Sequence, residues 1–383
     1  MKFLKKLLKW IVITIALLIA LLYLFDYGYI IRGAKIVYFT GHNTAFIDDY
    51  PYFENDTIKK GTDPQPWPIH KNYNSVEPTE KLIKVNNDWG TIAYLIIKND
   101  SIWFEKYYED FGKDSKTNSF SMAKSITTTL LGKAIMDGYI DNLDQPVSDF
   151  YPQYNDTKTT VGDLASMASG LDWVEHYTSP FSVTARANYD DDLAETILNQ
   201  KVIEEPGKSF KYLSGNTQLL GMIIEKASGK SLSNYLSESF WEPMGATDDA
   251  LWQLDDSKHK LAKAFCCISS NARDFARFGK LYKDYGKWNG KQLLDSSYAV
   301  KSVTPRFPES PQYGYGWWMK DVGSKHFFMM RGHLGQYVIV EPEDNLIIVR
   351  LGHRKSPDEG VGQFTRDITV YIEEAYNMLG YDL

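Results

Sequence analysis

Three short segments, far apart in the chain, carry side chains that could perform nucleophilic chemistry together. The first, residues 119–125 (SFSMAKS), places Ser121 three positions before Lys124. Positions i and i+3 share one face of a helix, so Lys124 can lie beside the Ser121 hydroxyl. A serine hydroxyl becomes a good nucleophile when a base takes its proton. A buried lysine can be that base, because burial lowers its pKa.

The context of this S-x-x-K pair distinguishes it from a second match at residues 257–260. The second match follows Asp255 and Asp256 in a charged stretch, which we interpret as solvated surface. Ser121 instead opens an apolar helical stretch directly after a predicted β-hairpin. There its backbone N–H would lie at a helix N-terminus, where developing negative charge is stabilised.

Two later segments add polar groups that such a nucleophile would need. Residues 206–216 (PGKSFKYLSGN) place Tyr212 and Ser214 on a turn before a predicted helix at 217–227. Residues 331–336 (RGHLGQ) precede a predicted strand, and Gly335 would let a substrate approach the strand edge closely. Taken singly, Tyr212 is more typical of a packed aromatic than of a catalytic group, and His333 is more typical of an ordinary polar residue.

The order and spacing of S-x-x-K, Y-x-S and H-x-G resembles the serine β-lactamase and penicillin-binding protein superfamily. Within it, the chain is similar to the class C β-lactamase-related serine hydrolases, and most of all to the 6-aminohexanoate-dimer hydrolase branch. The likeness covers about residues 89–379. It includes framework segments at 161–171, 240–247, 265–279 and 313–318.

This resemblance implies a role for each matching residue. Ser121 would be the nucleophile, Lys124 its activating partner, and Tyr212 the group that passes a proton to the leaving group. The backbone N–H groups of Ser121 and Gln336 would form the oxyanion hole. The residues expected to bind substrate are Tyr177, Ser214, Asn216, His333 and Gly335. For Tyr177, which lies in the 173–177 segment WVEHY, packing within its loop is the alternative.

Two departures from the superfamily pattern bear on the substrate. Ser214 stands where Y-x-N has asparagine, although Asn216 follows two residues later, and His333 stands where K-T-G has lysine. A neutral imidazole is a weaker anchor for the penicillin carboxylate than a lysine. We therefore expect esters or small amides to be better substrates than β-lactams.

The sequence lacks the motifs that are typical of other catalytic and cofactor-binding sites. The sequence has no G-x-S-x-G, H-E-x-x-H or C-x-x-C, and no Walker or Rossmann glycine pattern. The seven histidines show no metal-ligand clustering, so neither a metal nor a cofactor is expected. The two cysteines, Cys266 and Cys267, are neighbours, and we expect two small buried side chains without a bond between them.

The elements that must position these groups come from both ends of the chain. Residues 91–98 and 101–108 predict a β-hairpin with a two-residue turn, and residues 121–136 predict a helix. Strand patterns return at 326–330, 337–341 and 346–351, and a final helix is predicted at about 363–378. These elements predict an α/β (α+β) fold class, and the resemblance implies that it is β-lactamase/transpeptidase-like. One antiparallel sheet is flanked by helices, and a mainly helical subdomain is inserted at about 140–285.

The N-terminus predicts a membrane anchor. Four lysines in residues 2–9 precede the uncharged run WIVITIALLIALLYLF at 10–25, close to the length of a spanning helix. The lysines would remain cytoplasmic, which places the rest of the chain outside. A cleaved signal peptide is the alternative, but no small-residue cleavage site follows. We expect a single-pass protein of the bacterial inner (cytoplasmic) membrane with its catalytic domain on the extracytoplasmic, periplasmic side.

Charge supports this division of the 383-residue chain. Residues 1–35 hold six of the 42 basic residues and one of the 49 acidic ones, which leaves 36 basic and 48 acidic residues, or −12, for the remainder. An acidic domain argues against nucleic acid as a partner. The expected parts are an anchor (1–31), an extended lead-in over the domain surface (32–77, with three prolines at 64–68) and the hydrolase domain (78–383).

The leading hypothesis is a membrane-anchored serine hydrolase that cleaves a small amide, ester or short peptide through a Ser121 acyl-enzyme. One alternative is a D-alanyl-D-alanine carboxypeptidase or β-lactamase of the cell envelope. The other, of a different class, is a catalytically silent, membrane-tethered binding module.

Overall fold

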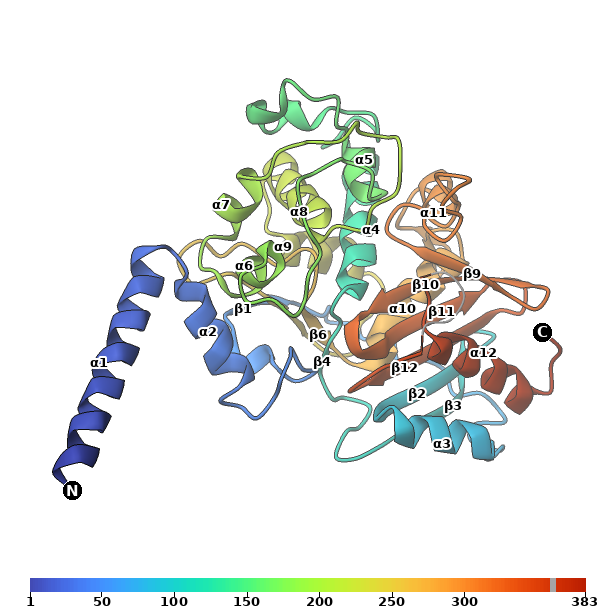
Figure 1. Ribbon diagram of the computed structural model, residues 1–383. Helices are drawn as coiled ribbons and strands as arrows, with labels where there is room; N and C mark the ends of the chain where they lie inside the picture. Colours follow the sequence, from blue (N-terminus) through green and yellow to red (C-terminus); the bar gives the residue numbers. More distant parts are fainter. Residues whose placement is uncertain (359–362) are drawn as a thin grey trace.

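A six-stranded antiparallel sheet is the framework of the catalytic region (Figure 1). The computed structural model describes residues 1–358 and 363–383. Across the sheet the order is β3-β2-β12-β11-β10-β9, so the first hairpin pairs directly with the last strand. The strands are β2 (Thr91–Lys98), β3 (Ser101–Tyr107), β9 (Trp318–Val322), β10 (Lys325–Gly332), β11 (Gln336–Glu341) and β12 (Leu346–Gly352). The prediction of one sheet built from both ends of the chain is confirmed.

The sheet is buried on both faces, as β2 shows. Tyr94 and Ile96 pack into one hydrophobic core, while Leu95 and Ile97 pack into the other, because successive side chains of a strand point to opposite faces. Helices α3 (Glu80–Asp88) and α12 (Arg366–Leu379) cover one face, and α4 (Met122–Met136) and α10 (Ala272–Lys283) pack on the other. The turn between β2 and β3 has positive φ at both Asn99 (50°) and Asp100 (59°), as a type I′ two-residue hairpin turn requires.

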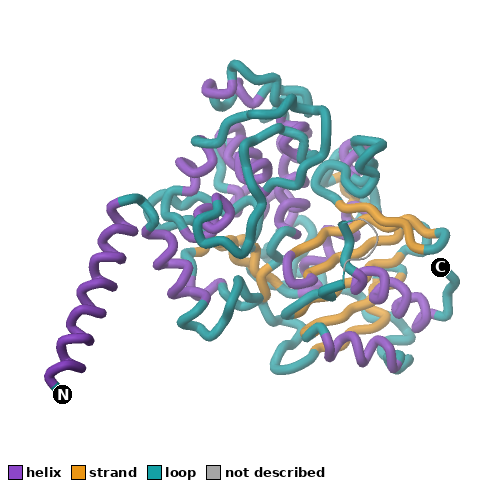
Figure 2. Tube along the Cα trace, in the orientation of Figure 1, coloured by secondary structure: helices purple, strands orange, loops and turns teal. Residues whose placement is uncertain are grey.

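Helices dominate the part of the chain between α4 and α10, and Figure 2 shows them in purple. They are α5 (Val161–Ala165), α6 (Val183–Tyr189), α7 (Leu193–Leu198), α8 (Ser214–Ser228) and α9 (Leu232–Leu236). A small second sheet, ordered β1-β5-β6-β4, runs beside them. Its strands are β1 (Asn55–Ile58), β4 (Thr117–Asn118), β5 (Ala250–Gln253) and β6 (Ile268–Ser270). The insertion therefore contains strands as well as the predicted helices.

Short elements complete the described chain. They are β7 (Lys287–Trp288), β8 (Lys291–Gln292), α11 (Ser296–Ser302), a π-helical turn (Ser237–Trp241) and 3₁₀ turns at Tyr50–Tyr52, Val147–Asp149, Pro152–Tyr154 and His333–Gly335. The last of these turns joins β10 to β11.

The N-terminal helix α1 (Lys2–Leu24) extends away from the rest of the chain (Figure 1), and none of its residues is buried. It is long and apolar enough to cross a membrane. The chain turns at Asp26 (φ 60°) and continues as α2 (Gly28–Val37), where an extended lead-in was expected. Helix α2 packs against α6: Gly33 lies under the Tyr189 ring, and Arg186 bonds Asp26 at 2.6 Å.

The cysteine pair differs from expectation. A disulfide joins Cys266 to Cys267, so the prediction of two unbonded side chains is wrong. Cys267 has a left-handed backbone (φ 74°), and both side chains are buried in the core between the sheet and the helical region. A pair of neighbouring cysteines gives no sequence signal for this backbone conformation, on which the meeting of the two sulfur atoms depends.

Candidate active site

The predicted nucleophile lies at the start of α4, in contact with its predicted base. Lys124 Nζ is 3.1 Å from Ser121 Oγ and donates a hydrogen bond to the Phe265 carbonyl oxygen at 2.9 Å. Only 2% of Lys124 is exposed, and burial lowers the pKa of its ammonium to about 8. About 9% of this lysine is therefore neutral at pH 7, and this neutral fraction can act as a base.

A strained residue turns Ser121 toward the cavity. Phe120, which precedes it, has φ 45°, a left-handed conformation that costs about 1 kcal/mol or more for a residue with a bulky side chain. The Phe120 N–H donates to the side-chain oxygen of Asn118 at 2.8 Å, which holds this conformation. As a result, the loop that follows β4 ends with Ser121 at the N-terminus of an apolar helix.

Tyr212, the third predicted catalytic residue, lies beside Ser121 and Lys124. Its ring lies 5.1 Å from Lys124 Nζ and packs on Trp318, with ring centroids 5.3 Å apart. Burial raises the pKa of the Tyr212 phenol well above its usual value, although a hydrogen bond with Ser121 opposes part of that rise. The phenol therefore keeps its proton at neutral pH and can give it to a leaving group.

A cavity of about 220 Å³ opens above Ser121. It is lined by Ser121, Glu175, Tyr177, Tyr212, Trp318, Arg331, Gly332, His333, Lys355 and Gln363. Four of the residues predicted for the site, Ser121, Tyr177, Tyr212 and His333, are among them. Lys124 contacts Ser121 from beneath.

His333 and Tyr177 form one wall of this cavity. Their rings stack with centroids 5.6 Å apart and an angle of 16° between planes, and Phe120 meets the His333 ring edge-on. Burial, with a smaller contribution from the nearby Lys355 charge, lowers the pKa of His333 to about 4. His333 is therefore neutral at pH 7, as expected from its type.

The turn that carries His333 is fixed from behind by a buried arginine. Leu334 (φ 60°) and Gly335 (φ 85°) are both left-handed, and Arg350 donates to their carbonyl oxygens at 3.0 and 2.8 Å. A Cβ on Gly335 would lie 2.2 Å from Arg350 Nη1. Gly335 therefore shapes the turn before Gln336 and does not line the cavity, a different role from direct substrate contact.

Glu175 is a site residue that the motifs did not reveal. Its carboxylate accepts bonds from the backbone and hydroxyl of Ser214 (both 2.7 Å), from the Trp173 indole (2.8 Å) and from the Tyr177 hydroxyl (2.5 Å). It thereby links the loop before α6 to the start of α8. The only signal in the sequence was its position in the segment that contains Tyr177.

Ser214 and Asn216 point to different sides of helix α8. Helix α8 begins at Ser214, and residues two apart on a helix do not face the same way. Asn216 is fully buried, bonds Ser169 and Met167 in a neighbouring loop, and does not line the cavity. The expectation that it borders the substrate therefore finds no support in this geometry.

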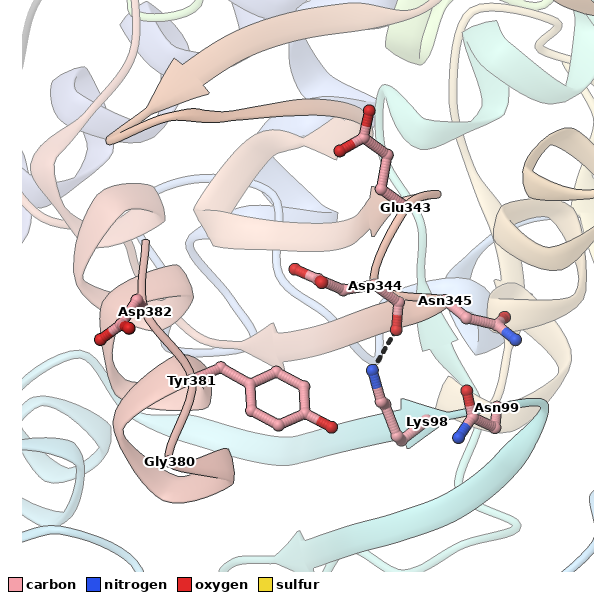
Figure 3. A pocket seen from close by; sticks show the side chains of 8 residues that line it. All are labelled: Lys98, Asn99, Glu343, Asp344, Asn345, Gly380, Tyr381 and Asp382. Carbon is pink, nitrogen blue, oxygen red and sulfur yellow. Dashed lines mark hydrogen bonds between the residues drawn. The ribbon is translucent and has the colours of Figure 1, made fainter.

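Two other features are not part of this site. A larger open cleft of about 550 Å³ lies where the β2–β3 and β11–β12 turns meet the C-terminus (Figure 3). There Lys98 donates to the Asp344 carbonyl oxygen and lies over the Tyr381 ring. In the described part of the chain, one acidic group with a histidine (Asp255, Asp256 and His259) has ligand-type atoms within 4.8 Å of one another. Backbone N–H groups already occupy its carboxylates.

The fold and the site together define a class. The class is that of the β-lactamase/transpeptidase-like serine hydrolases. Its features here are an antiparallel sheet, a serine–lysine pair at a helix N-terminus, a tyrosine beside them and a strand bordering the cavity. The chain matches the family described as Beta-lactamase over residues 80–369, and it belongs to that family. It is accordingly an enzyme that acts on amide or ester substrates.

Individual relatives agree with this assignment. The chain is 27% identical over 295 residues to the 6-aminohexanoate-dimer hydrolase of Paenarthrobacter ureafaciens, covering 70% of this chain and 74% of that protein. It is 25% identical to Protein flp of Staphylococcus aureus, covering 69% of this chain but only 59% of the relative.

Solved structures share the fold. A putative 6-aminohexanoate-dimer hydrolase from Bacillus anthracis superimposes with a TM-score of 0.71 at 19% identity, covering 92% of this chain and 95% of the other. A penicillin-binding protein from Bacillus halodurans gives 0.61 at 17% identity, covering 78% and 99%.

Proposed function

We propose that this chain hydrolyses small amides or esters through a covalent Ser121 acyl-enzyme. The observation that carries the proposal is the 3.1 Å approach of Lys124 Nζ to Ser121 Oγ, together with the lowered pKa of that lysine. A neutral amine at hydrogen-bond distance from a hydroxyl can accept its proton as the oxygen attacks a carbonyl carbon.

The acylation step follows from these positions. Ser121 Oγ forms a bond to the carbonyl carbon while its proton moves to Lys124 Nζ, and negative charge develops on the carbonyl oxygen. The backbone N–H groups of Ser121, at the start of α4, and of Gln336, at the start of β11, would stabilise that oxygen. When the bond to the amine or alcohol breaks, Tyr212 supplies its proton and recovers one from Lys124.

Deacylation reverses the roles with water as the nucleophile. Water gives a proton to the Tyr212–Lys124 pair and forms a bond to the acyl carbon. Ser121 Oγ then leaves and takes the proton back. The products are a carboxylic acid and the free enzyme, and no step requires a metal or an organic cofactor.

The cavity walls bear on the substrate class. Neutral His333 and the Tyr177 ring form an uncharged face beside Ser121. The histidine at this position favours a small amide or ester over a β-lactam, whose carboxylate is better bound by a lysine there, although two cations, Arg331 and Lys355, also line the cavity. The names of two relatives, a 6-aminohexanoate-dimer hydrolase and a penicillin-binding protein, are compatible with both this proposal and the alternative of a D-alanyl-D-alanine carboxypeptidase or β-lactamase.

The test is a hydrolysis screen across 4-nitrophenyl esters, short amides, D-amino-acid peptides and β-lactams, with Ser121→Ala as the control. We expect turnover of at least one class that the variant lacks. Equal rates for the two proteins would remove Ser121 from the nucleophile role. A protein that a fluorophosphonate labels at Ser121 is not the catalytically silent binding module.

We further propose that α1 anchors the enzyme in the bacterial cytoplasmic membrane with its catalytic domain outside. The apolar surface of α1, none of which is buried, and the lysines at its start support this topology. The full chain should resist extraction by alkaline carbonate, and its domain should be cleaved by protease added to spheroplasts. A chain released by carbonate would refute the anchor.

A further inference from the structure

A buried carboxylate in the lead-in reaches the backbone beneath the catalytic residues. Asp49 is 3% exposed and lies just before the turn at Tyr50–Tyr52. It is outside residues 80–369, which match the family. Its Oδ1 atom accepts two hydrogen bonds, from Asn118 Nδ2 at 2.9 Å and from Gln253 Nε2 at 2.7 Å. Both donors are themselves fully or almost fully buried.

The first of these bonds leads to Ser121. Asn118 uses its amide nitrogen for Asp49 and its amide oxygen for the Phe120 N–H, at 2.8 Å. The same residue donates its backbone N–H to the Ile47 carbonyl oxygen at 2.6 Å. The lead-in thus fixes the orientation of the amide that holds Phe120 in its left-handed conformation, and Phe120 sets the direction of Ser121.

The second bond leads to Lys124. Gln253 accepts a bond from Lys263 Nζ at 3.4 Å, and its backbone bonds both Lys263 and Cys267. These two residues bracket Phe265, whose carbonyl oxygen receives the hydrogen bond from Lys124. The segment 263–267 is therefore tied to Asp49 on the side opposite to the base.

We infer that Asp49 is a positioning residue for hydrolysis. Its carboxylate holds at once the backbone that aims Ser121 and the backbone that receives Lys124. A carboxylate is suited to this because one of its oxygens accepts two amide donors in a region that water does not reach. The inference rests on the proposed function, since it concerns the geometry of the same serine–lysine pair.

Removal of this carboxylate should change kcat and its pH dependence in a way that a loss of stability alone would not. In Asp49→Ala, the Asn118 and Gln253 amides lose their acceptor, so the Ser121–Lys124 distance is no longer fixed in the folded enzyme. We expect kcat per active site to fall at least tenfold while KM changes less than threefold. The pH midpoint of kcat/KM should also rise, because a less firmly held Lys124 regains solvent and its pKa moves back toward 10.5.

The experiment uses the full chain in detergent, with intact sites counted by fluorophosphonate labelling and unfolding followed by circular dichroism. Glu374→Ala is the matched control, since Glu374 is also a buried carboxylate (2% exposed) but bonds Thr79 on the other face of the sheet. It should lower stability without changing kcat per labelled site. Asp49→Asn retains an oxygen that can accept both bonds, and it should keep at least a third of the wild-type kcat.

The outcomes are distinct. If the wild type shows no Ser121-dependent hydrolysis, the proposed function is wrong. If the wild type is active and Asp49→Ala keeps kcat per labelled site within twofold, the positioning role is wrong. Should Asp49→Ala not fold, Gln253→Met tests the branch toward Lys124 alone: a higher pH midpoint supports the inference, and an unchanged one overturns it.

Discussion

Raising the pH from 7 to 9 should increase Ser121-dependent hydrolysis about tenfold and then produce a plateau. The reason is the state of Lys124, which must be neutral to accept the serine proton. Its pKa is about 8 because the ammonium is buried. About 9% of the enzyme is then in the neutral form at pH 7 and about 91% at pH 9.

Tyr212 and His333, which line the cavity with Ser121, do not ionise between pH 7 and 9. The pKa of Tyr212 lies well above its usual value, so the phenol remains protonated across this range. His333, with a pKa of about 4, stays neutral throughout. An exposed lysine of pKa 10.5 would give a different profile, in which the rate climbs roughly tenfold for each pH unit up to pH 10.

The assay is kcat/KM for a 4-nitrophenyl ester at half-unit steps from pH 6 to 10, because this parameter reports ionisations of the free enzyme. The rate with Ser121→Ala is subtracted at each pH to remove hydroxide-driven hydrolysis. A midpoint between about 7 and 9 fits the buried base. A profile that is flat over the range, or that still rises tenfold between pH 9 and 10, would refute the assignment of Lys124.

Three further outcomes follow from the same geometry. Lys124→Met should be inactive yet about 1–3 kcal/mol more stable to urea at pH 7. The pKa of Lys124 in the folded state lies below its usual value of 10.5, so the unfolded state binds more protons between pH 8 and 10.5. Wild-type stability therefore rises with pH through that window, and the stability difference between Lys124→Met and the wild type shrinks. Glu175→Gln should lower kcat/KM roughly tenfold by releasing Tyr177 and Ser214. It should also move the pH midpoint below 8, since the Glu175 charge raises the pKa of Lys124; an unchanged midpoint would contradict this. Gly335→Ala should cost roughly 2 kcal/mol or more in thermal unfolding, through its positive φ and the Arg350 contact, and a Tm equal to wild type would count against that reading.

Features that depend on neighbours along the chain could be predicted from the sequence. The i, i+3 spacing of Ser121 and Lys124 is a property of any helix, and the structure has the two atoms at 3.1 Å. The hairpin and its Asn99-Asp100 turn follow from β-rich runs around a two-residue linker, and the structure has β2 and β3 at almost the predicted bounds. The sequence also placed the early and late strands in one antiparallel sheet, but the pairing of β2 with β12 was seen only in the structure.

Features that depend on the meeting of distant segments could not be predicted. Glu175 binds Ser214, 39 residues later, and Asp49 binds Asn118 and Gln253, 69 and 204 residues later. A single carboxylate in a sequence gives no sign of such partners.

Small shifts in element boundaries also could not be predicted from the sequence. The start of α8 at Ser214, three residues before the predicted start, turns Asn216 into the core. The left-handed backbone of Cys267 accompanies a disulfide that two adjacent cysteines did not suggest. The sequence by itself therefore predicted the main helices and strands and the proximity of Ser121 to Lys124, because helix and strand periodicity are local. Only the tertiary structure decided which buried groups orient and support that pair, because those contacts join segments that the chain order keeps apart.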